Sequence, residues 1–194
     1  MAGYVRKDIT GPSTPDMATV TVDSRTDLTG WGAVYRQYTE RIDKVSESAN
    51  GMSLQRTLWR VVSEADGDRL EEITPGTMLR VGDRVRVQFN LSTDRALEYV
   101  QLKDMRAASF EPVNTSAGRR WGMGSGISYY AAPENSCNNF YIDRMEKGSY
   151  RIEYDLNVQK PGVYQAGLAV MQCLYAPAFR ATSTAQTVSV DNNE

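Results

Sequence analysis

Strict alternation of apolar and polar residues, with no sustained helical period anywhere, is the feature that most constrains the fold of this chain. The cleanest run lies between residues 150 and 159, where every second residue is apolar: Tyr150, Ile152, Tyr154, Leu156 and Val158. A second run places Val85, Val87, Phe89 and Leu91 on one side. Because successive side chains of a strand point to opposite faces of its sheet, each run predicts a half-buried strand.

Shorter alternating runs recur along the chain and are separated by turn signals. Asp66-Gly67, Pro75-Gly76 and Pro161-Gly162 are three of these signals. Short strands at this spacing are typical of β-sandwiches of the immunoglobulin or fibronectin kind. We therefore predict an all-β fold, a seven-stranded antiparallel β-sandwich that is preceded by a few extra strands.

The first fifty residues differ from the rest. Residues 18–23 and 31–38 each alternate like a strand, but two or three strands do not bury a core by themselves. Residues 40–53 have the polar composition of a linker. We interpret residues 1–50 as the C-terminal remnant of a neighbouring β-domain plus a linker, and residues 51–194 as the terminal sandwich domain.

The residue types present leave little room for catalysis or metal binding. The chain has 194 residues and no histidine, which excludes Ser-His and Cys-His nucleophile pairs and the commonest transition-metal ligand. We predict a chain that is not an enzyme and that carries no cofactor or metal. The formal net charge of -2 gives no electrostatic reason to expect nucleic acid as a partner. No apolar run approaches the roughly 18 residues of a membrane-spanning helix, so direct membrane insertion is not expected.

The two cysteines, Cys137 and Cys173, are too few and too far apart for a zinc site with paired spacing. Two alternatives remain. They form a single disulfide, or they are two buried thiols, which is the common state of a packed cysteine.

Residues 99–112 combine a strand-like run with opposed charges and end at a proline. Lys103, Asp104, Arg106 and Glu111 bring two charges of each sign into a short span. A solvated strand end is the ordinary interpretation of such a run. With no histidine, metal set or nucleophile beside them, we interpret these four residues as a structural charge cluster that fixes a loop by mutual pairing.

Five segments, in this order, resemble the C-terminal end of the bacterial alpha-2-macroglobulin family. They are WGAVYRQY at residues 31–38, VGDRV at 81–85, YVQLKDMRAASFEP at 99–112, KGSYRIEY at 147–154 and LYAPAF at 174–179. The resemblance spans almost the whole chain. It implies that roughly residues 54–194 form the last macroglobulin-like domain, and that residues 1–45 return from the thioester-type helical domain through a neighbouring β-domain.

Proteins of this family are large envelope-associated traps, in which a protease cuts a bait region and an internal thioester captures the attacker. The Cys and Gln pattern of a thioester is absent from this chain. The resemblance therefore implies a non-catalytic terminal domain of a protease inhibitor. It would pack against the thioester-type domain and other macroglobulin domains of its parent, shield the thioester, and meet proteases only through that parent. It also implies an extracytoplasmic location, in the periplasm or cell envelope.

Residues 174–179 resemble the family's Met-Tyr-Ala-Pro-Glu-Phe motif, and Tyr175, Pro177 and Phe179 are the interface residues that this implies. Leu174 and Ala178 stand where the family often has Met and Glu. Tyrosine is enriched at interfaces because it brings a large apolar area with a polar tip. We expect Tyr175 to be at least partly exposed beside an apolar patch.

A free-standing β-sandwich that binds a carbohydrate or a protein ligand on an aromatic face is the alternative. A fragment of a larger protein would show an open sheet edge or an exposed apolar strip along residues 1–50. A complete binding module would bury that segment and show a separate aromatic cleft.

Overall fold

The computed structural model describes residues 5–11, 19–23, 27–35, 37, 39–122, 124 and 126–192. The chain divides into two compact units, Met1–Tyr38 and Thr39–Glu194. In the first unit the described residues form no strand and no helix, and every one of them is exposed.

The strands expected at residues 18–23 and 31–38 are not formed in the part of the first unit that the structure describes. Residues 19–23, 31–35 and 37 have no strand conformation, and Ala18, Arg36 and Tyr38 lie outside the described residues. A strand needs a partner both for its backbone groups and for its apolar face. The assignment of residues 1–50 to a neighbouring domain stays a prediction.

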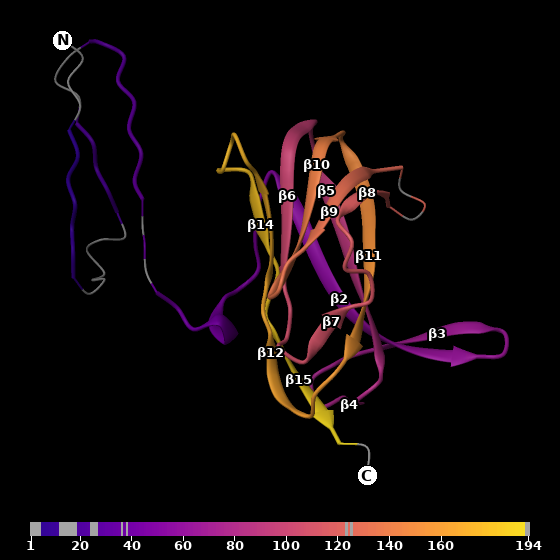
Figure 1. Ribbon diagram of the computed structural model, residues 1–194. Coiled ribbons are helices and arrows are strands. Elements are labelled where there is room, and N and C mark those ends of the chain that lie inside the picture. Colours follow the sequence, from indigo (N-terminus) through magenta and orange to yellow (C-terminus); the bar gives the residue numbers. More distant parts are fainter. Residues whose placement is uncertain are drawn as a thin grey trace. The chain divides into compact units, whose positions relative to one another are not determined.

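The second unit is built from three sheets and one short 3-10 helix, η2 (Ile42–Lys44) (Figure 1). The strands of the largest sheet are, in spatial order, β1 (Ser48–Asn50), β14 (Arg180–Thr182), β13 (Ala169–Cys173), β6 (Leu97–Met105), β10 (Cys137–Met145), β9 (Ser128–Pro133) and β8 (Gly118–Trp121). Those of the second sheet are β3 (Gly67–Glu72), β2 (Met52–Glu64), β5 (Arg84–Thr93), β11 (Gly148–Val158) and β7 (Phe110–Pro112). The smallest sheet contains β12 (Gly162–Ala166), β15 (Gln186–Asp191) and β4 (Met78–Arg80).

This architecture confirms the all-β, mainly antiparallel sandwich expected from the alternation. The strands are shorter and more numerous than the seven expected, because turns and loops divide the chain into 15 strands within the described residues. Every pair is antiparallel except β15 with β4, which run parallel.

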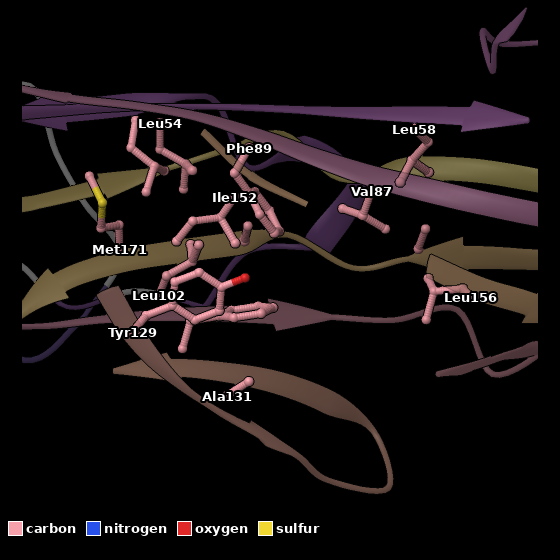
Figure 2. Packing of buried hydrophobic residues seen from close by; sticks show 14 of the residues in the cluster. Leu54, Leu58, Val87, Phe89, Leu102, Tyr129, Ala131, Ile152, Leu156 and Met171 are labelled. Atoms are coloured by element: carbon pink, nitrogen blue, oxygen red, sulfur yellow. The ribbon is translucent and has the colours of Figure 1, made fainter. Parts of the chain in front are cut away.

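The core lies between the two larger sheets and follows the alternation of β5 and β11. Strand β5 alternates buried with half-buried residues along its whole length. The rings of Phe89 from β5 and Phe140 from β10 meet edge to face, with their centroids 5.9 Å apart. Figure 2 shows the side chains of both sheets between the ribbons, with Leu54, Phe89 and Ile152 from one sheet and Leu102 and Met171 from the other. Removal of this apolar surface from water supplies the main driving force for folding.

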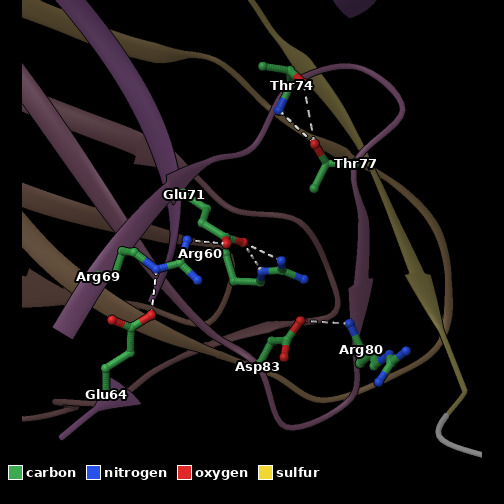
Figure 3. A network of polar contacts seen from close by, with 8 residues as sticks. All are labelled: Arg60, Glu64, Arg69, Glu71, Thr74, Thr77, Arg80 and Asp83. Atoms are coloured by element: carbon green, nitrogen blue, oxygen red, sulfur yellow. Dashed lines mark hydrogen bonds and ion pairs between the residues drawn. The ribbon is translucent and has the colours of Figure 1, made fainter. Parts of the chain in front are cut away.

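The solvent side near β3 carries a network of charged pairs (Figure 3). Arg69 contacts Glu64 and Glu71, both at 2.6 Å, and Glu71 also contacts Arg60. Each of these side chains is about a third to a half exposed. Water screens exposed ion pairs, so each pair contributes little to stability. The network stabilises the hairpin only modestly.

Gly51, between β1 and β2, generates the first prediction. Its φ is +70°, and a Cβ placed on it would lie 2.4 Å from Cδ1 of Phe179. We expect Gly51→Ala to lower the free energy of unfolding by about 2–4 kcal/mol, since backbone strain adds to the overlap. Gly76→Ala is the control, because Gly76 has a φ of +98° and nothing within 4 Å of its Cβ position. Urea unfolding should give a loss of only about 1–2 kcal/mol for the control, from backbone strain alone. Equal losses in both variants would contradict the close approach of Phe179.

Candidate functional site

The charged residue at the centre of the predicted cluster, Asp104, lies between the two large sheets. Its carboxylate is fully buried, and Oδ1 lies 2.9 Å from Nε of Arg56, whose side chain is 3% exposed. The geometry is that of an ion pair without a hydrogen bond between these two atoms. The Tyr154 hydroxyl donates to Oδ2 of Asp104. Since Arg56 comes from β2, Tyr154 from β11 and Asp104 from β6, this triad joins the sheets.

The protonation states of the triad follow from burial and from its charges. Burial raises the pKa of the Asp104 carboxyl, whereas Arg56, the Tyr154 hydroxyl and Arg106 act in the opposite direction. Burial and the neighbouring Asp104 raise the pKa of Tyr154 well above its ordinary value, so its hydroxyl keeps the proton that it donates. Arg56 also donates to the backbone carbonyls of Ala166 and Gly167, at 3.2 and 2.8 Å.

The other three residues of the predicted cluster have different surroundings. Arg106 is buried and donates to Oδ1 of Asn138 at 2.6 Å and to the carbonyls of Glu134 and Asn135 at 2.6 and 2.9 Å. It therefore fixes the turn between β9 and β10. Lys103 is half-buried and Glu111 is exposed, and neither belongs to an ion pair of the described residues. Asp104 and Arg106 thus bind partners elsewhere in the chain.

Sequence reasoning missed Arg56 and Tyr154 as partners of Asp104. A signal for Arg56 was available, because it shares the inward side of its strand with Leu54 and Leu58. A charge on an apolar face requires a buried partner. Which residue supplies that partner depends on how the two sheets face each other, and alternation within one strand does not contain that information.

The triad generates the second prediction. Removing one member of a buried ion pair leaves the other charge without compensation, so Asp104→Ala should lower the free energy of unfolding by about 3–5 kcal/mol. Combining Asp104→Leu with Arg56→Met should recover most of that loss, because both charges are then absent. The matched control is Asp143→Ala in the exposed Arg119–Asp143 pair, whose side chains are 59% and 67% exposed.

Denaturant unfolding of the unmodified chain, Asp104→Ala, the double variant and Asp143→Ala tests this prediction. The control should lose less than about 1 kcal/mol, as exposed pairs do. If Asp104→Ala loses no more than Asp143→Ala, the triad does not stabilise the fold in the way proposed.

The predicted interface residues lie in the loop of residues 174–179, between β13 and β14. Tyr175 is 81% exposed and Leu174 is 47% exposed, which matches the exposure expected beside an apolar patch. Pro177 is exposed and Phe179 is half-buried. The guanidinium carbon of Arg95 lies 5.2 Å from the centre of the Phe179 ring.

Hydrogen bonds hold this loop in one shape. The amide of Cys173 donates to the carbonyl of Phe179 at 3.1 Å, and the amide of Phe179 donates to the carbonyl of Ala176 at 2.9 Å. The side chain of Asn50 donates to the carbonyl of Ala178 at 2.7 Å. The loop is therefore closed on itself and attached to β1.

Tyr99 joins this loop, which the sequence did not indicate. By simple alternation Tyr99 would share the buried side of its strand with Leu97, yet its side chain is 51% exposed. The rings of Tyr99 and Tyr175 meet edge to face, with centroids 5.1 Å apart and planes at 81°. We call these two residues the tyrosine pair. The role of Tyr175, Pro177 and Phe179 at a domain contact stays a prediction.

Both cysteines are free, buried thiols, so the second of the two alternatives is the state in this structure. The thiol of Cys173 lies 3.1 Å from the carbonyl oxygen of Glu98 and donates to it. The thiol of Cys137 lies 3.4 Å from a carboxylate oxygen of Glu134. Burial and this carboxylate raise the pKa of Cys137, which makes its thiolate rare at neutral pH.

A pocket of about 330 Å³ lies beside β9, β10 and β11. Arg86 and Asp155 in its wall pair with each other at 2.8 and 3.0 Å, and Arg120 donates to the carbonyl of Ser116 at 2.8 Å. Its rings are those of Tyr129, Phe140 and Tyr154, whereas the exposed rings of Trp121 and Tyr175 do not line it. The exposed aromatic rings of Trp121 and Tyr175 therefore lie outside this pocket.

Within the ranges described above, no group of three or more His, Cys, Asp and Glu side chains is placed to hold a metal ion. Likewise, no helix of the described residues is long and apolar enough to cross a membrane.

Comparison with solved structures finds similar folds in bacterial alpha-2-macroglobulins. A mutant of Salmonella alpha-2-macroglobulin is 18% identical, with a TM-score of 0.57 over 75% of this chain and 10% of its own. Native alpha-2-macroglobulin of Escherichia coli, spanning domain MG7 to the C-terminus, is 16% identical, with a TM-score of 0.57 over 74% of this chain and 24% of its own. A cryo-EM reconstruction of the native Escherichia coli protein is 16% identical, with a TM-score of 0.56 over 81% of this chain and 10% of its own.

At these identities the similarity shows the fold, and the chain spans only a tenth to a quarter of the proteins it resembles. None of the curated proteins compared with it matches. The sequence profile of the bacterial alpha-2-macroglobulin MG10 domain matches residues 51–178, which is more than half of the chain. This chain therefore belongs to the family of bacterial alpha-2-macroglobulin MG10 domains.

Proposed function

We propose that this chain is a non-catalytic, C-terminal structural and interaction domain of a bacterial alpha-2-macroglobulin-like protease inhibitor. In this proposal it packs against the thioester-type domain and other macroglobulin domains of the same parent and shields the thioester region from water. Proteases reach it only through the parent, and its location is extracytoplasmic. The family membership and the geometry of the loop of residues 174–179 support this proposal.

The observation that carries the proposal is the exposure of Tyr175 on a loop of defined shape. A ring that is 81% exposed gains nothing from burial in its own domain. Leu174 and the ring of Tyr99 add exposed apolar area beside it, and the loop is held by backbone hydrogen bonds. Interfaces concentrate their binding energy in such aromatic residues, and a preformed loop loses little conformational entropy when a partner covers it.

Exposed apolar residues in the first unit also support this proposal. Val22, Trp31 and Tyr35 are 84%, 89% and 91% exposed. Large apolar side chains in this number usually mark a surface that another domain covers.

The third prediction tests the contact in the full-length parent. We expect the backbone amides of residues 174–176, 178 and 179 to exchange with deuterium at least about tenfold more slowly in the parent than in the isolated chain, because the partner domain covers them. Tyr175→Ala in the parent should remove most of that protection. Tyr130→Ala is the matched control, since Tyr130 is another exposed tyrosine, at 43%, on a strand of the same sheet.

Where the parent carries a thioester, a second measurement reports shielding directly. An amine such as methylamine attacks the acyl carbon, forms an amide and releases the cysteine thiol, which a thiol reagent detects. Tyr175→Ala should accelerate this release, and Tyr130→Ala should not. Equal exchange of residues 174–179 in the parent and in the isolated chain would falsify the proposed contact.

A further inference from the structure

Tyr99 is the one non-glycine residue with a positive φ in the part of the chain that the structure describes. Its φ of 55° lies in the left-handed region, which is uncommon for any residue with a side chain and unusual inside a strand. Such a conformation persists only where surrounding contacts enforce it, and residues of this kind cluster at functional sites.

The strand around Tyr99 is irregular in a way that turns its ring outward. Leu97 and Val100 are both buried, although residues three apart on a regular strand face opposite sides. Glu98 and Tyr99 between them are both exposed. The pairing with the neighbouring strand β10 is interrupted at the same place. Ile142 pairs with Val100 and Arg144 with Glu98, but no β10 residue pairs with Tyr99. The register is the same on both sides of Tyr99, so the irregularity is confined to this residue.

Two contacts attach the irregular position to the loop of residues 174–179. The amide of Leu174 donates to the carbonyl of Tyr99 at 2.9 Å. The thiol of Cys173 donates to the carbonyl of Glu98 at 3.1 Å. The backbone on both sides of the tyrosine pair is therefore connected, and the two rings meet at 5.1 Å.

We propose that Tyr99 is a positioning residue for Tyr175. Its left-handed conformation directs its ring out of the sheet, where the ring supports Tyr175 edge to face and holds it in one orientation for the neighbouring domain. This inference rests on the proposed function, because Tyr175 is taken to be the residue that makes the domain contact. An aromatic pair presents Tyr175 with its side-chain freedom already reduced, which favours association.

The test uses variants that separate the ring of Tyr99 from its backbone. Tyr99→Asn removes the ring but accepts a positive φ, and Tyr99→Gly does the same if the first variant does not fold. Tyr99→Phe keeps the ring. Tyr130→Asn is the control for loss of an exposed tyrosine elsewhere in the same sheet.

The first readout is the side-chain rotamer of Tyr175 in the whole 194-residue chain, from three-bond couplings measured by NMR. We expect one rotamer in the unmodified chain, in Tyr99→Phe and in Tyr130→Asn, and averaging over rotamers in Tyr99→Asn. A residue that merely stabilises the fold would not produce this pattern. If Tyr175 keeps a single rotamer in Tyr99→Asn, the positioning role is wrong.

The second readout is deuterium exchange of residues 174–179 in the full-length parent. We expect Tyr99→Asn to reduce the protection by at least about threefold, and Tyr99→Phe to retain it. If Tyr175→Ala removes protection but Tyr99→Asn does not, the inference about Tyr99 fails and the proposed domain contact stands. If Tyr175→Ala itself changes nothing, the proposed contact fails, and the rotamers alone decide whether Tyr99 positions Tyr175.

Discussion

The buried ion pair between Arg56 and Asp104 is the interaction on which the rest of this domain depends. Apolar side chains favour contact between two sheets but accept many relative positions, since the hydrophobic effect has no direction. A buried charge is tolerated only where its partner lies opposite. With Tyr154 donating to the same carboxylate, the pair selects the arrangement in which β2, β11 and β6 meet at one point.

Strand β6 extends from the buried ion pair to the surface of the domain. Asp104 lies near its C-terminal end inside the core, and Tyr99 lies near its beginning, where the ring faces solvent beside Tyr175. The same strand thus takes part in the join between the sheets and in the proposed domain contact. Because packed cores resist small shifts, the position of the outer ring follows from the position of the strand.

In the first unit an alternating sequence is not accompanied by a strand among the described residues. Residues 19–23 and 31–35 carry the pattern of strands, but the part of the chain that the structure describes forms no sheet there. A strand buries its apolar face only when another strand or layer lies beside it.

The sequence by itself determined the fold class, since alternation within β5 and β11 depends only on local spacing and matches the observed burial. It also placed Asp104 and Arg106 in a cluster of charges and Tyr175 on an exposed motif. Only the tertiary structure decided that Asp104 pairs with Arg56 and Tyr154, that both cysteines are free, and that the exposed ring of Tyr99 lies beside Tyr175. These facts depend on contacts between residues distant in the chain and on one backbone angle. The alternation of residues along a single strand gives no information about long-range contacts or about that angle.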